Sequence, residues 1–487
     1  MKAKQKKKKN KLIYKIIVSI LFIASILFVI GLMCLNVLSI KWFMLVLGVL
    51  LIIDFLLWLF IIKSKKKKTS SFIAILFTLI LSLGSFYIFK TNGLLTDVVS
   101  NYKTYNYSVL VLNDIGYTKI KELDNKVMGY LDNDAKEEKQ SLEHIKNKIT
   151  PDLKDYEDIE QMGNDLLTQN VDSILIEDSY LSMLKEENSK YETDCKVIYT
   201  FKVRVKIENL SKDVDVTKKA FSIYVSGIDT YGTVDSVSRS DVNLIVTVNP
   251  KTKQILMTSI PRDCEIELHK NGKMDKLTHT GIYGVEETIS TIEDFLDLDV
   301  NYYARTNFSG ITNIIDALGG VTVDSDYEFT TRHGNYHIVK GENELDGDKG
   351  LCFVRERYNL PSGDYDRGRN QQKLLKAMLN KAMSPKIITN FQRILTAIEG
   401  CFETNMSSDE IKSLINMQLD DNAEWDVFNV QLDGKGYMTD QTYSMHGTSI
   451  YVMKPYASYV KKITKLIDRV ENGDKITEND VKGLGGE

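Results

Sequence analysis

Apolar residues form three long runs within the first 90 positions of the chain. The runs cover residues 12–35, 42–62 and 72–89. Each is close to the ~20 residues that a helix needs to cross the hydrocarbon core of a membrane. A cleaved signal peptide has a shorter apolar stretch, and two further runs would not follow it. The pattern therefore predicts three transmembrane helices, which we assign to residues 1–92.

Most lysines near these runs lie at the ends that would face the same side of a membrane. Seven precede the first run and five separate the second from the third, whereas segment 36–41 between the first and second holds one. Positive charge favours the cytoplasmic face, so we expect the N-terminus inside and everything from about residue 91 outside the cell. Lysines beside membrane spans also favour contact with anionic membrane lipid. No second ionisable residue lines up with Asp54 in the second run, so we interpret it as a tolerated acid.

Residues 101–219 are polar and carry two kinds of pattern. Alternation at 107–112 and 196–207 predicts strands, and residues 152–188 show helical spacing with many acids. This stretch contains no recognisable chemical motif. We predict a small α+β accessory domain over 101–219, which acts as a spacer or as a surface for a partner.

From residue 220 onward, runs of β-branched residues alternate with amphipathic segments. The runs FSIYVSGID, VNLIVTVN and KQILMTSI begin at residues 221, 242 and 253, and a PKTK turn joins the last two as a hairpin. Helices are expected at 284–296, 310–318, 366–383, from 407 and from 454, with strands at 300–306, 321–323 and 425–432. Such alternation predicts an α/β layered domain over 220–487.

The overall charge balance of the 487 residues conceals an asymmetry. There are 62 basic and 66 acidic residues, a net charge of −4. The first 90 residues hold 15 lysines and one acid, a net of +14, so the remaining 397 carry −18. An outer part this acidic would repel a phosphate backbone, which argues against binding to nucleic acid and against a transcriptional role.

Four motifs place charged residues directly beside the apolar runs of the last domain. They are Gly227-Ile228-Asp229, Ser238-Arg239-Ser240-Asp241, Ile260-Pro261-Arg262-Asp263 and Arg355-Glu356-Arg357, and the last is followed by Arg367, Arg369, Gln371 and Gln372. Strand ends in an α/β sheet are where ligands usually bind. Arginine matches phosphate oxygens with a planar fork, and Mg²⁺ takes one or two carboxylates plus the phosphates of a substrate. One such motif is typical of a solvated ion-pair edge, but four together predict a pyrophosphate–magnesium site.

These motifs resemble those of the LytR–CpsA–Psr (LCP) family of cell-wall phosphotransferases. The resemblance covers residues 221–384 and rests on SGIDT, SRSDVNLIVTVNPKTKQILMTSIPRD, DKLTHTGIYG, VNYYARTNF, IIDALGGVTVD, ELDGDKGLCFVRERY and GDYDRGRNQQ, in the order of the family. Three spans followed by an accessory domain are similar to the capsule-associated branch. The resemblance implies a layered α-β-α domain and an enzyme that acts outside the membrane.

The resemblance also implies a reaction. The enzyme would transfer a glycopolymer, such as capsular polysaccharide or teichoic acid, from a polyprenyl-pyrophosphate carrier to peptidoglycan. The metal-binding acids of the family fall on Asp229 and Asp241, which would hold Mg²⁺. The positions that bind pyrophosphate fall on Arg239, Arg262, Lys276, Arg355, Arg357, Arg367 and Gln371. Envelope assembly proteins are possible partners of residues 101–219, and the abundance of Lys, Ile and Asn favours a Gram-positive source.

The polyprenyl tail requires an apolar slot, which the resemblance places between the sheet and the helices. Its candidate lining is Phe295, Leu296, Ile311, Ile314, Ile315, Leu318, Leu375, Met378 and Leu379. By spacing alone these residues are ordinary core positions, and the two interpretations differ only in whether space is left open.

The chemical step has open alternatives at this stage. With Arg262, Arg355 and Arg357 at the pyrophosphate, a hydroxyl of a wall sugar would attack the phosphorus nearest the glycan, and Asp263 or Asp366 would accept the proton. Hydrolysis of the carrier by the same site, and a non-catalytic role as a membrane regulator of envelope polymer synthesis, are the competing hypotheses.

Two cysteines flank the predicted site. Cys264 follows the Pro-Arg-Asp motif, and Cys352 precedes Arg355 by three residues. Oxidation is possible outside the membrane, so a Cys264–Cys352 disulfide is one expectation and two buried thiols are the other.

Overall fold

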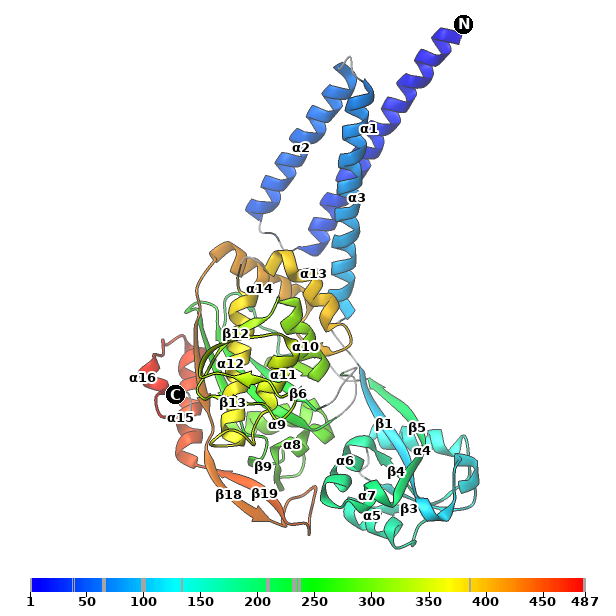
Figure 1. Cartoon of the computed structure of the whole chain (residues 1–487), viewed down its shortest axis with the longest axis vertical. Coiled ribbons are helices and arrows are strands. Elements are labelled where there is room, and N and C mark those ends of the chain that lie inside the picture. Colours follow the sequence, from blue (N-terminus) through cyan, green and yellow to red (C-terminus); the bar gives the residue numbers. More distant parts are fainter. Residues whose placement is uncertain are drawn as a thin grey trace. The chain divides into compact units, whose positions relative to one another are not determined.

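The computed structural model describes most of the chain. The described residues are 2–36, 38, 40–63, 67–97, 102–132, 135–206, 211–229, 234, 238–384 and 387–484. Lys65 and Lys66 of the second lysine run and the predicted boundary at residue 101 lie outside them. The chain divides into two compact units. One comprises residues 1–99, 383–399 and 407–423, and the other comprises 100–382, 400–406 and 424–487. Both are shown in Figure 1.

The first unit contains the three predicted apolar helices, which the structure confirms. They are α1 (Lys2–Leu35), α2 (Ile40–Lys63) and α3 (Lys67–Asp97). Their apolar parts are long enough to cross a membrane, with mean hydropathy of 3.0, 3.0 and 2.3. Small residues allow close packing, since a side chain at Gly84 would lie 2.8 Å from the ring of Phe28. The apolar helices therefore supply a membrane anchor.

Two helices from late in the sequence belong to this same unit. They are α13 (Ile387–Ile398), which no sequence pattern had indicated, and α14 (Ser408–Asp421), which matches the helix expected from residue 407. Lys412 of α14 is 5% exposed, and its Nζ lies 3.1 Å from Asn92 Oδ1 and 3.4 Å from the carbonyl oxygen of Cys34. The helix thus packs on the ends of α1 and α3 that follow the apolar runs.

The second unit begins with a five-stranded sheet of order β3-β2-β4-β1-β5. Its strands are β1 (Tyr102–Leu112), β2 (Val127–Leu131), β3 (Asp152–Tyr156), β4 (Ser173–Glu177) and β5 (Cys195–Lys206), with helices α4 (Lys136–Lys146), α5 (Ile159–Leu167), α6 (Asp178–Glu187) and α7 (Lys190–Thr193). We call residues 102–206 the accessory domain. The expectation of helix throughout 152–188 is wrong in part, because β3 and β4 interrupt it. Every residue of β4 is buried. A short run that is buried on both faces shows neither the alternation of a strand nor the spacing of a helix, so its sequence does not distinguish the two.

A six-stranded mixed sheet forms the centre of the remaining part of this unit, residues 211–382, 400–406 and 424–484, which we call the catalytic domain after the activity that the sequence resemblance implies. Its order is β16-β11-β6-β7-β8-β17. The bounds are β6 (Phe221–Ile228), β7 (Ser240–Asn249), β8 (Gln254–Ser259), β11 (Tyr302–Asn307), β16 (Phe402–Thr404) and β17 (Asp426–Gln431). Strands β6, β7 and β8 are antiparallel neighbours, whereas β11 runs parallel to β6.

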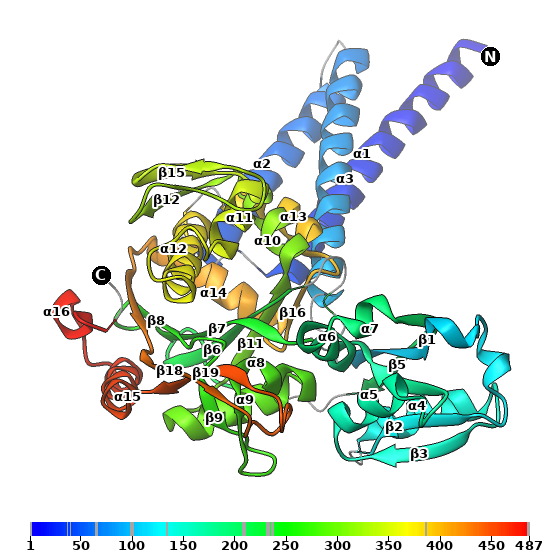
Figure 2. The same cartoon turned by 60° about the horizontal axis from the view of Figure 1, so that its bottom comes forward.

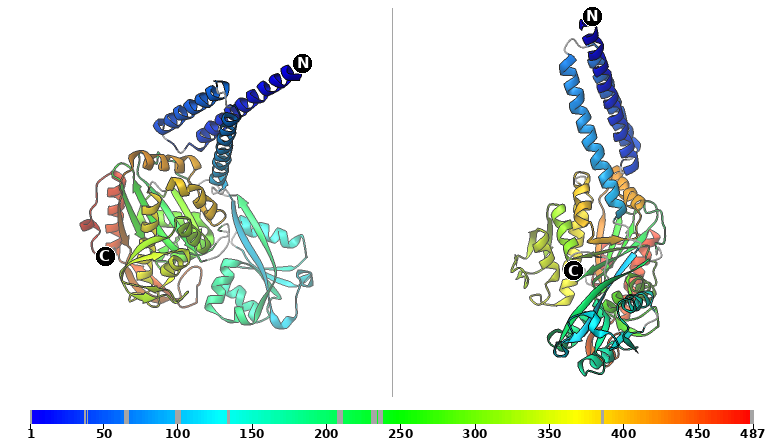
Figure 3. Two further views of the ribbon diagram at one scale, coloured as in Figure 1. Left: turned by 45° about the horizontal axis from the view of Figure 1, so that its top comes forward. Right: turned by 90° about the vertical axis from the view of Figure 1, so that its right-hand side faces the viewer.

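Helices cover both faces of this sheet, as Figure 2 and Figure 3 show. One face carries α9 (Val285–Leu296) and α15 (Ala457–Asn472), whose apolar residues form one core with Tyr224 and Ile245 of the sheet. The other carries α10 (Phe308–Ala317), α11 (Gly347–Arg355) and α12 (Asp364–Ala382). The side-chain amide of Gln372 in α12 donates to the carbonyl oxygens of Met257 and Val430 in the sheet. The layered α-β-α expectation is confirmed.

Short elements complete the catalytic domain. They are β9 (Glu265–Glu267), β10 (Met274–Lys276), α8 (Leu277–Thr280), η3 (Gly281–Tyr283), β12 (Val321–Ser325), β13 (Phe329–Thr330), β14 (His337–Ile338), β15 (Gly341–Leu345), β18 (Gly434–Thr439), β19 (Ile450–Pro455) and α16 (Glu478–Val481). The β18–β19 hairpin was not expected from the sequence. Its first strand is mostly exposed, so it lacks the alternation of a half-buried strand.

Candidate active site

The strand register brings the charged motifs to one edge of the six-stranded sheet. Ile228 at the end of β6 pairs with Ser240 at the start of β7, and Ser259 at the end of β8 pairs with Leu244. Because β7 is antiparallel to both neighbours, its first residues meet the last residues of β6 and β8. Asp229, Asp241 and Arg262 therefore converge although they come from three separate motifs.

A cavity of about 530 Å³ opens at this edge. Seven of the residues predicted to bind the metal or the pyrophosphate line it, namely Asp229, Asp241, Arg262, Arg355, Arg357, Arg367 and Gln371. Arg355 is the last residue of α11, Arg357 lies in the loop after it, and Arg367 and Gln371 stand one turn apart near the start of α12. With Arg332, five arginines face the cavity, so it is suited to a ligand with several negative charges.

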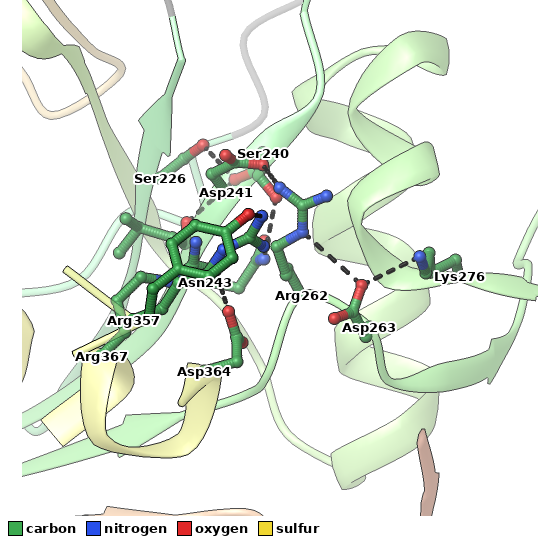
Figure 4. Close-up of polar contacts among 12 residues, drawn as sticks. Ser226, Ser240, Asp241, Asn243, Arg262, Asp263, Lys276, Arg357, Asp364 and Arg367 are labelled. Atoms are coloured by element: carbon green, nitrogen blue, oxygen red, sulfur yellow. Dashed lines mark hydrogen bonds and ion pairs between the residues drawn. The ribbon is translucent and has the colours of Figure 1, made fainter. Parts of the chain in front are cut away.

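Arg262 is held between two carboxylates. Its Nη1 lies 2.6 Å from Asp241 Oδ1, and its Nε lies 3.6 Å from Asp263 Oδ1. Lys276 Nζ contacts the same oxygen of Asp263 at 2.9 Å, as Figure 4 shows. Burial by itself would raise the pKa of Asp263, but Lys276 and Arg262 outweigh it and hold that pKa below its ordinary value. The guanidinium of Arg262 is thus fixed in place before any ligand binds.

Arg239 and Lys276 lie beside the main cavity rather than in its lining. They face a small cavity of about 30 Å³ that shares Arg262 with the larger one. The backbone before Arg239 packs tightly on η3, since a side chain at Gly281 would lie 2.6 Å from the carbonyl oxygen of Ser238. Glycine at position 281 is therefore required for this close approach, and the GIYG motif has a structural reason.

Asp229 and Asp241 form the acidic part of the site. Burial and the neighbouring Asp241 raise the pKa of Asp229, while Arg355, Arg239 and Arg262 act in the opposite direction. Among the described residues, no group of three or more His, Cys, Asp and Glu side chains is arranged to hold a metal ion. Mg²⁺ usually takes only one or two protein carboxylates and completes its shell with phosphates and water, so the donor set fits that ion.

Glu356 is a residue whose role the sequence did not reveal. It is 2% exposed, and its carboxylate accepts four backbone N–H groups, those of Arg332, Arg357, Tyr358 and Asn359, at 2.5–3.0 Å. One buried carboxylate therefore ties two cavity-lining arginines together by their backbones. Its position between two arginines was the only signal in the sequence.

Aromatic rings support the arginines of the cavity. The guanidinium of Arg355 lies 4.0 Å from the centroid of the Phe308 ring. Arg332 and Arg357 lie 4.4 Å and 4.6 Å from the ring of Tyr358, whose hydroxyl accepts a hydrogen bond from Arg357 Nη2 at 2.5 Å. This hydrogen bond lowers the pKa of Tyr358. The sequence analysis did not select Arg332 and His333, which lie outside the four motifs, or Tyr358, which directly follows the fourth motif but carries no charge.

The nine candidates for the lipid slot do not lie together. Phe295 and Leu296 belong to the core that α9 and α15 form on the opposite face of the sheet, with Leu296 1% exposed. Their assignment to the slot is therefore corrected. The remaining candidates are Ile311, Ile314, Ile315, Leu318, Leu375, Met378 and Leu379, all in or beside α10 and α12. Ile311 lines the arginine cavity, and Ile315 and Leu318 are buried.

The two proton-acceptor candidates differ in their surroundings. Asp263 is paired with Arg262 and Lys276 as described above. Asp366 is 2% exposed, and its Oδ2 accepts the backbone N–H of Ser362 at 2.8 Å. Neither residue lines the cavity, so the geometry selects neither as the base.

The expected disulfide is absent between the two cysteines. Cys264 and Cys352 are both free thiols. Cys264 is completely buried in the core under α9 and α15, whereas Cys352 is partly exposed in α11 on the other face of the sheet. The alternative of two buried thiols holds for Cys264 but not for Cys352.

Comparison with known proteins gives consistent matches. The LytR_cpsA_psr family model matches residues 179–459. A polyisoprenyl-teichoic acid–peptidoglycan teichoic acid transferase TagU from Enterococcus faecalis is 32% identical over 265 residues, which cover 54% of this chain and 82% of that protein. The TagU of Bacillus cereus is 34% identical over 234 residues, covering 47% and 73%.

A solved structure also shows partial similarity. The crystal structure of B. subtilis TagV aligns with a TM-score of 0.44 and 27% identity, covering 52% of this chain and 98% of that one. The family model spans more than half of the chain, including every strand that carries a charged motif. The chain therefore belongs to the LytR–CpsA–Psr family.

Proposed function

We propose that this protein transfers a glycopolymer from a polyprenyl-pyrophosphate carrier to peptidoglycan, outside the cell. The observation that carries the proposal is the cavity in which five arginines and two aspartates converge at the edge of the sheet. Such a lining matches a pyrophosphate with its metal ion. The relatives named above are teichoic acid transferases, so teichoic acid and capsular polysaccharide are the polymers to test first.

The arginines would bind and orient the pyrophosphate. Arg262 is already fixed by Asp241 and Asp263, and Arg367 Nη2 lies 2.6 Å from Asp364 Oδ1, so neither guanidinium has to be ordered when the substrate arrives. Asp229 and Asp241 would hold Mg²⁺, which when bound supplies positive charge against the phosphate oxygens. Arg355 and Arg357 enter from the helical side and enclose the same ligand.

The reaction balances as a phosphoryl transfer. A hydroxyl oxygen of a wall sugar forms a bond to the phosphorus nearest the glycan, and the bond from that phosphorus to the bridging oxygen breaks. Polyprenyl phosphate leaves with the bridging oxygen and takes up the proton of the attacking hydroxyl, and the product is a phosphodiester between polymer and peptidoglycan. Positioning and charge neutralisation are the main requirements of such a step. The half-buried apolar residues of α10 and α12 are where we place the lipid tail.

The experiment uses the full chain in detergent micelles. It is supplied with a polyprenyl-pyrophosphate-linked glycan, Mg²⁺ and purified peptidoglycan, and the polymer attached to the insoluble wall is measured. Attached polymer with stoichiometric polyprenyl phosphate is the expected result. Release of free glycan phosphate without attachment would identify a carrier hydrolase instead, and the absence of both products would favour the regulatory role.

The orientation of the chain is a separate part of the proposal. The lysine distribution favours a cytoplasmic N-terminus and an external catalytic domain. Protease added to intact cells with the wall removed should digest the catalytic domain, whereas full protection would overturn this orientation.

A further inference from the structure

A second polar cavity lies between the accessory domain and the catalytic domain. Its volume is about 320 Å³, and its walls come from β1, β4 and α4 on one side and from η3 and α9 on the other. Apolar packing joins the two domains beside it, because Leu181 and Leu184 share a core with Ile282 and Met445. The cavity is therefore part of a packed interface.

Glutamates dominate the lining of this cavity. They are Glu137, Glu138, Glu177, Glu286 and Glu287, and the cationic side chain among the lining residues is Lys270. The ammonium group of Lys270 lies over the ring of Tyr283, 3.7 Å from its centroid, and four tyrosines complete the polar lining. The nominal charge is strongly negative, opposite in sign to that of the arginine cavity.

Two of these carboxylates are buried without full compensation. Glu138 and Glu177 are each 6% exposed, and Oε1 of each has no hydrogen-bond partner among the described residues. The other oxygen of Glu177 accepts the backbone N–H of Ser179 at 2.9 Å. Burial raises the pKa of each to about 8, with Glu137 adding to the effect at Glu138. Ionised carboxylates buried in this way are costly unless they take up a proton or a ligand brings positive charge.

The spacing of the glutamates favours an organic cation over a metal ion. Within the described part of the chain, no three His, Cys, Asp or Glu side chains are placed to coordinate one metal ion directly. The volume is several times the ~30 Å³ that a water molecule occupies in the liquid, so a molecule of several heavy atoms fits. Carboxylate and tyrosine oxygens accept N–H donors, and tyrosine rings attract ammonium groups.

We propose that this cavity binds a primary amine, with its ammonium group between Glu138 and Glu177 of the accessory domain and Glu286 of the catalytic domain. The proposal gives the accessory domain a binding role. The site is independent of the transfer reaction, because amine binding requires neither the carrier nor the peptidoglycan acceptor.

Isothermal titration calorimetry on the full chain in micelles tests the proposal. One arm uses 1,5-diaminopentane, and a second uses a neutral capped tripeptide with a single lysine, so a free amine and a peptide-borne amine are distinguished. One-to-one binding of either probe is expected. The probe that binds more tightly shows whether the natural ligand is a free amine or the lysine of a peptide. CaCl₂ and NaCl at equal ionic strength should not reproduce it. No binding of either amine, or equal binding of calcium, would overturn the proposal.

The variants locate the binding. The double variant Glu138→Gln with Glu177→Gln should weaken amine binding by at least about tenfold, because each change removes a charged acceptor. Glu143→Gln is the matched control, since Glu143 is exposed on the same helix as Glu138. Glu286→Gln on the opposite wall gives the same test if the double variant does not fold. Unchanged affinity for the amine in both the double variant and the Glu286→Gln variant would exclude this cavity as the site.

Discussion

The arginine cavity at the sheet edge differs from the cavity between the accessory and catalytic domains, which we call the glutamate cavity. The two differ in how far their buried carboxylates are compensated by neighbouring positive charge. At the first, Asp241 in the lining and Asp263 beside it are paired with Arg262 and Lys276, and the pKa of Asp263 lies below its ordinary value, whereas burial and Asp241 raise that of Asp229. In the second, Glu138 and Glu177 lack such pairing, and their pKa values rise to about 8. A paired cavity keeps its charged groups in position, whereas an unpaired one must take up protons or an external cation.

Replacing Arg262, which pairs with Asp241 and Asp263, should reduce activity more than any other substitution proposed. Arg262→Ala leaves Asp241 and Asp263 without their shared partner and removes a phosphate-binding group, so we expect transfer to fall by at least about 100-fold. The initial rate of polymer attachment measures this. Arg469→Ala is the control, because Arg469 forms a half-buried ion pair with Asp480 on α15 and α16, and neither residue lines the arginine cavity. Near-normal turnover of the Arg262 variant would contradict the site.

Metal removal tests the acidic part of the arginine cavity. EDTA should abolish attachment, and added Mg²⁺ should restore it. Asp229→Asn should raise the Mg²⁺ concentration for half-maximal rate by at least about tenfold, since even groups that only orient metal ligands have effects of that size. Asp324→Asn, at an exposed position of β12, should leave the Mg²⁺ dependence unchanged. Full activity in EDTA would exclude the metal.

Glu356 is the most completely satisfied carboxylate of the arginine cavity. Glu356→Gln replaces an acceptor of four N–H groups by a side chain that also donates, so the loop that carries Arg357 should lose its position. We expect a loss of about 2 kcal/mol in stability and a roughly tenfold lower rate. Thermal unfolding and kcat/KM measure the two effects, with Glu344→Gln at an exposed position of β15 as the control. A rate equal to that of the wild type would show that Glu356 does not position the arginines.

The unpaired glutamates predict a distinct pH dependence of stability. The pKa of each rises on folding from about 4.5 to about 8, so the folded state binds more protons between these values. The free energy of unfolding should therefore fall as pH rises through this window, by a few kcal/mol on the order-of-magnitude scale of such shifts. Melting temperatures at pH 5 and pH 8 measure this.

The double variant Glu138→Gln with Glu177→Gln should lose most of this pH dependence. It should be more stable than the wild type at pH 8, because a neutral amide has no proton to release. A steeper pH dependence in the variant would contradict the assignment of these two groups.

The smallest effect is expected at the rim of the arginine cavity. Tyr358→Phe keeps the ring beside Arg332 and Arg357 but removes the hydroxyl that accepts from Arg357, so we expect a rate lower by about two- to threefold. Tyr358→Ala also removes the ring and should have the larger effect. The ratio of the two rates separates the hydrogen bond from the ring contact, and equal rates would show that the ring contributes nothing.

Much of the fold was predictable because its signals are local. The three apolar helices, strand β7 and helix α9 each have a run or a period that a short window of sequence contains. The errors fall where a window is ambiguous, as in the five buried residues of β4, or where a strand is exposed, as in β18. Asp229, Asp241 and Arg262 of the arginine cavity were predictable because charged side chains directly beside apolar runs mark strand ends, where ligands of α/β sheets usually bind. The other four predicted residues of this cavity come from helices α11 and α12 and the loop between them, namely Arg355, Arg357, Arg367 and Gln371.

By itself, the sequence determined the apolar helices, the alternation of strands and helices, and the residues able to bind phosphate. Only the tertiary structure decided which residues meet. It placed Phe295 and Leu296 on the other face of the sheet, separated Cys264 from Cys352, and brought Glu138 and Glu286 from two domains to one cavity. The physical reason is that helix and strand periods are set by neighbours in the chain, whereas burial and charge pairing depend on residues that are distant in it.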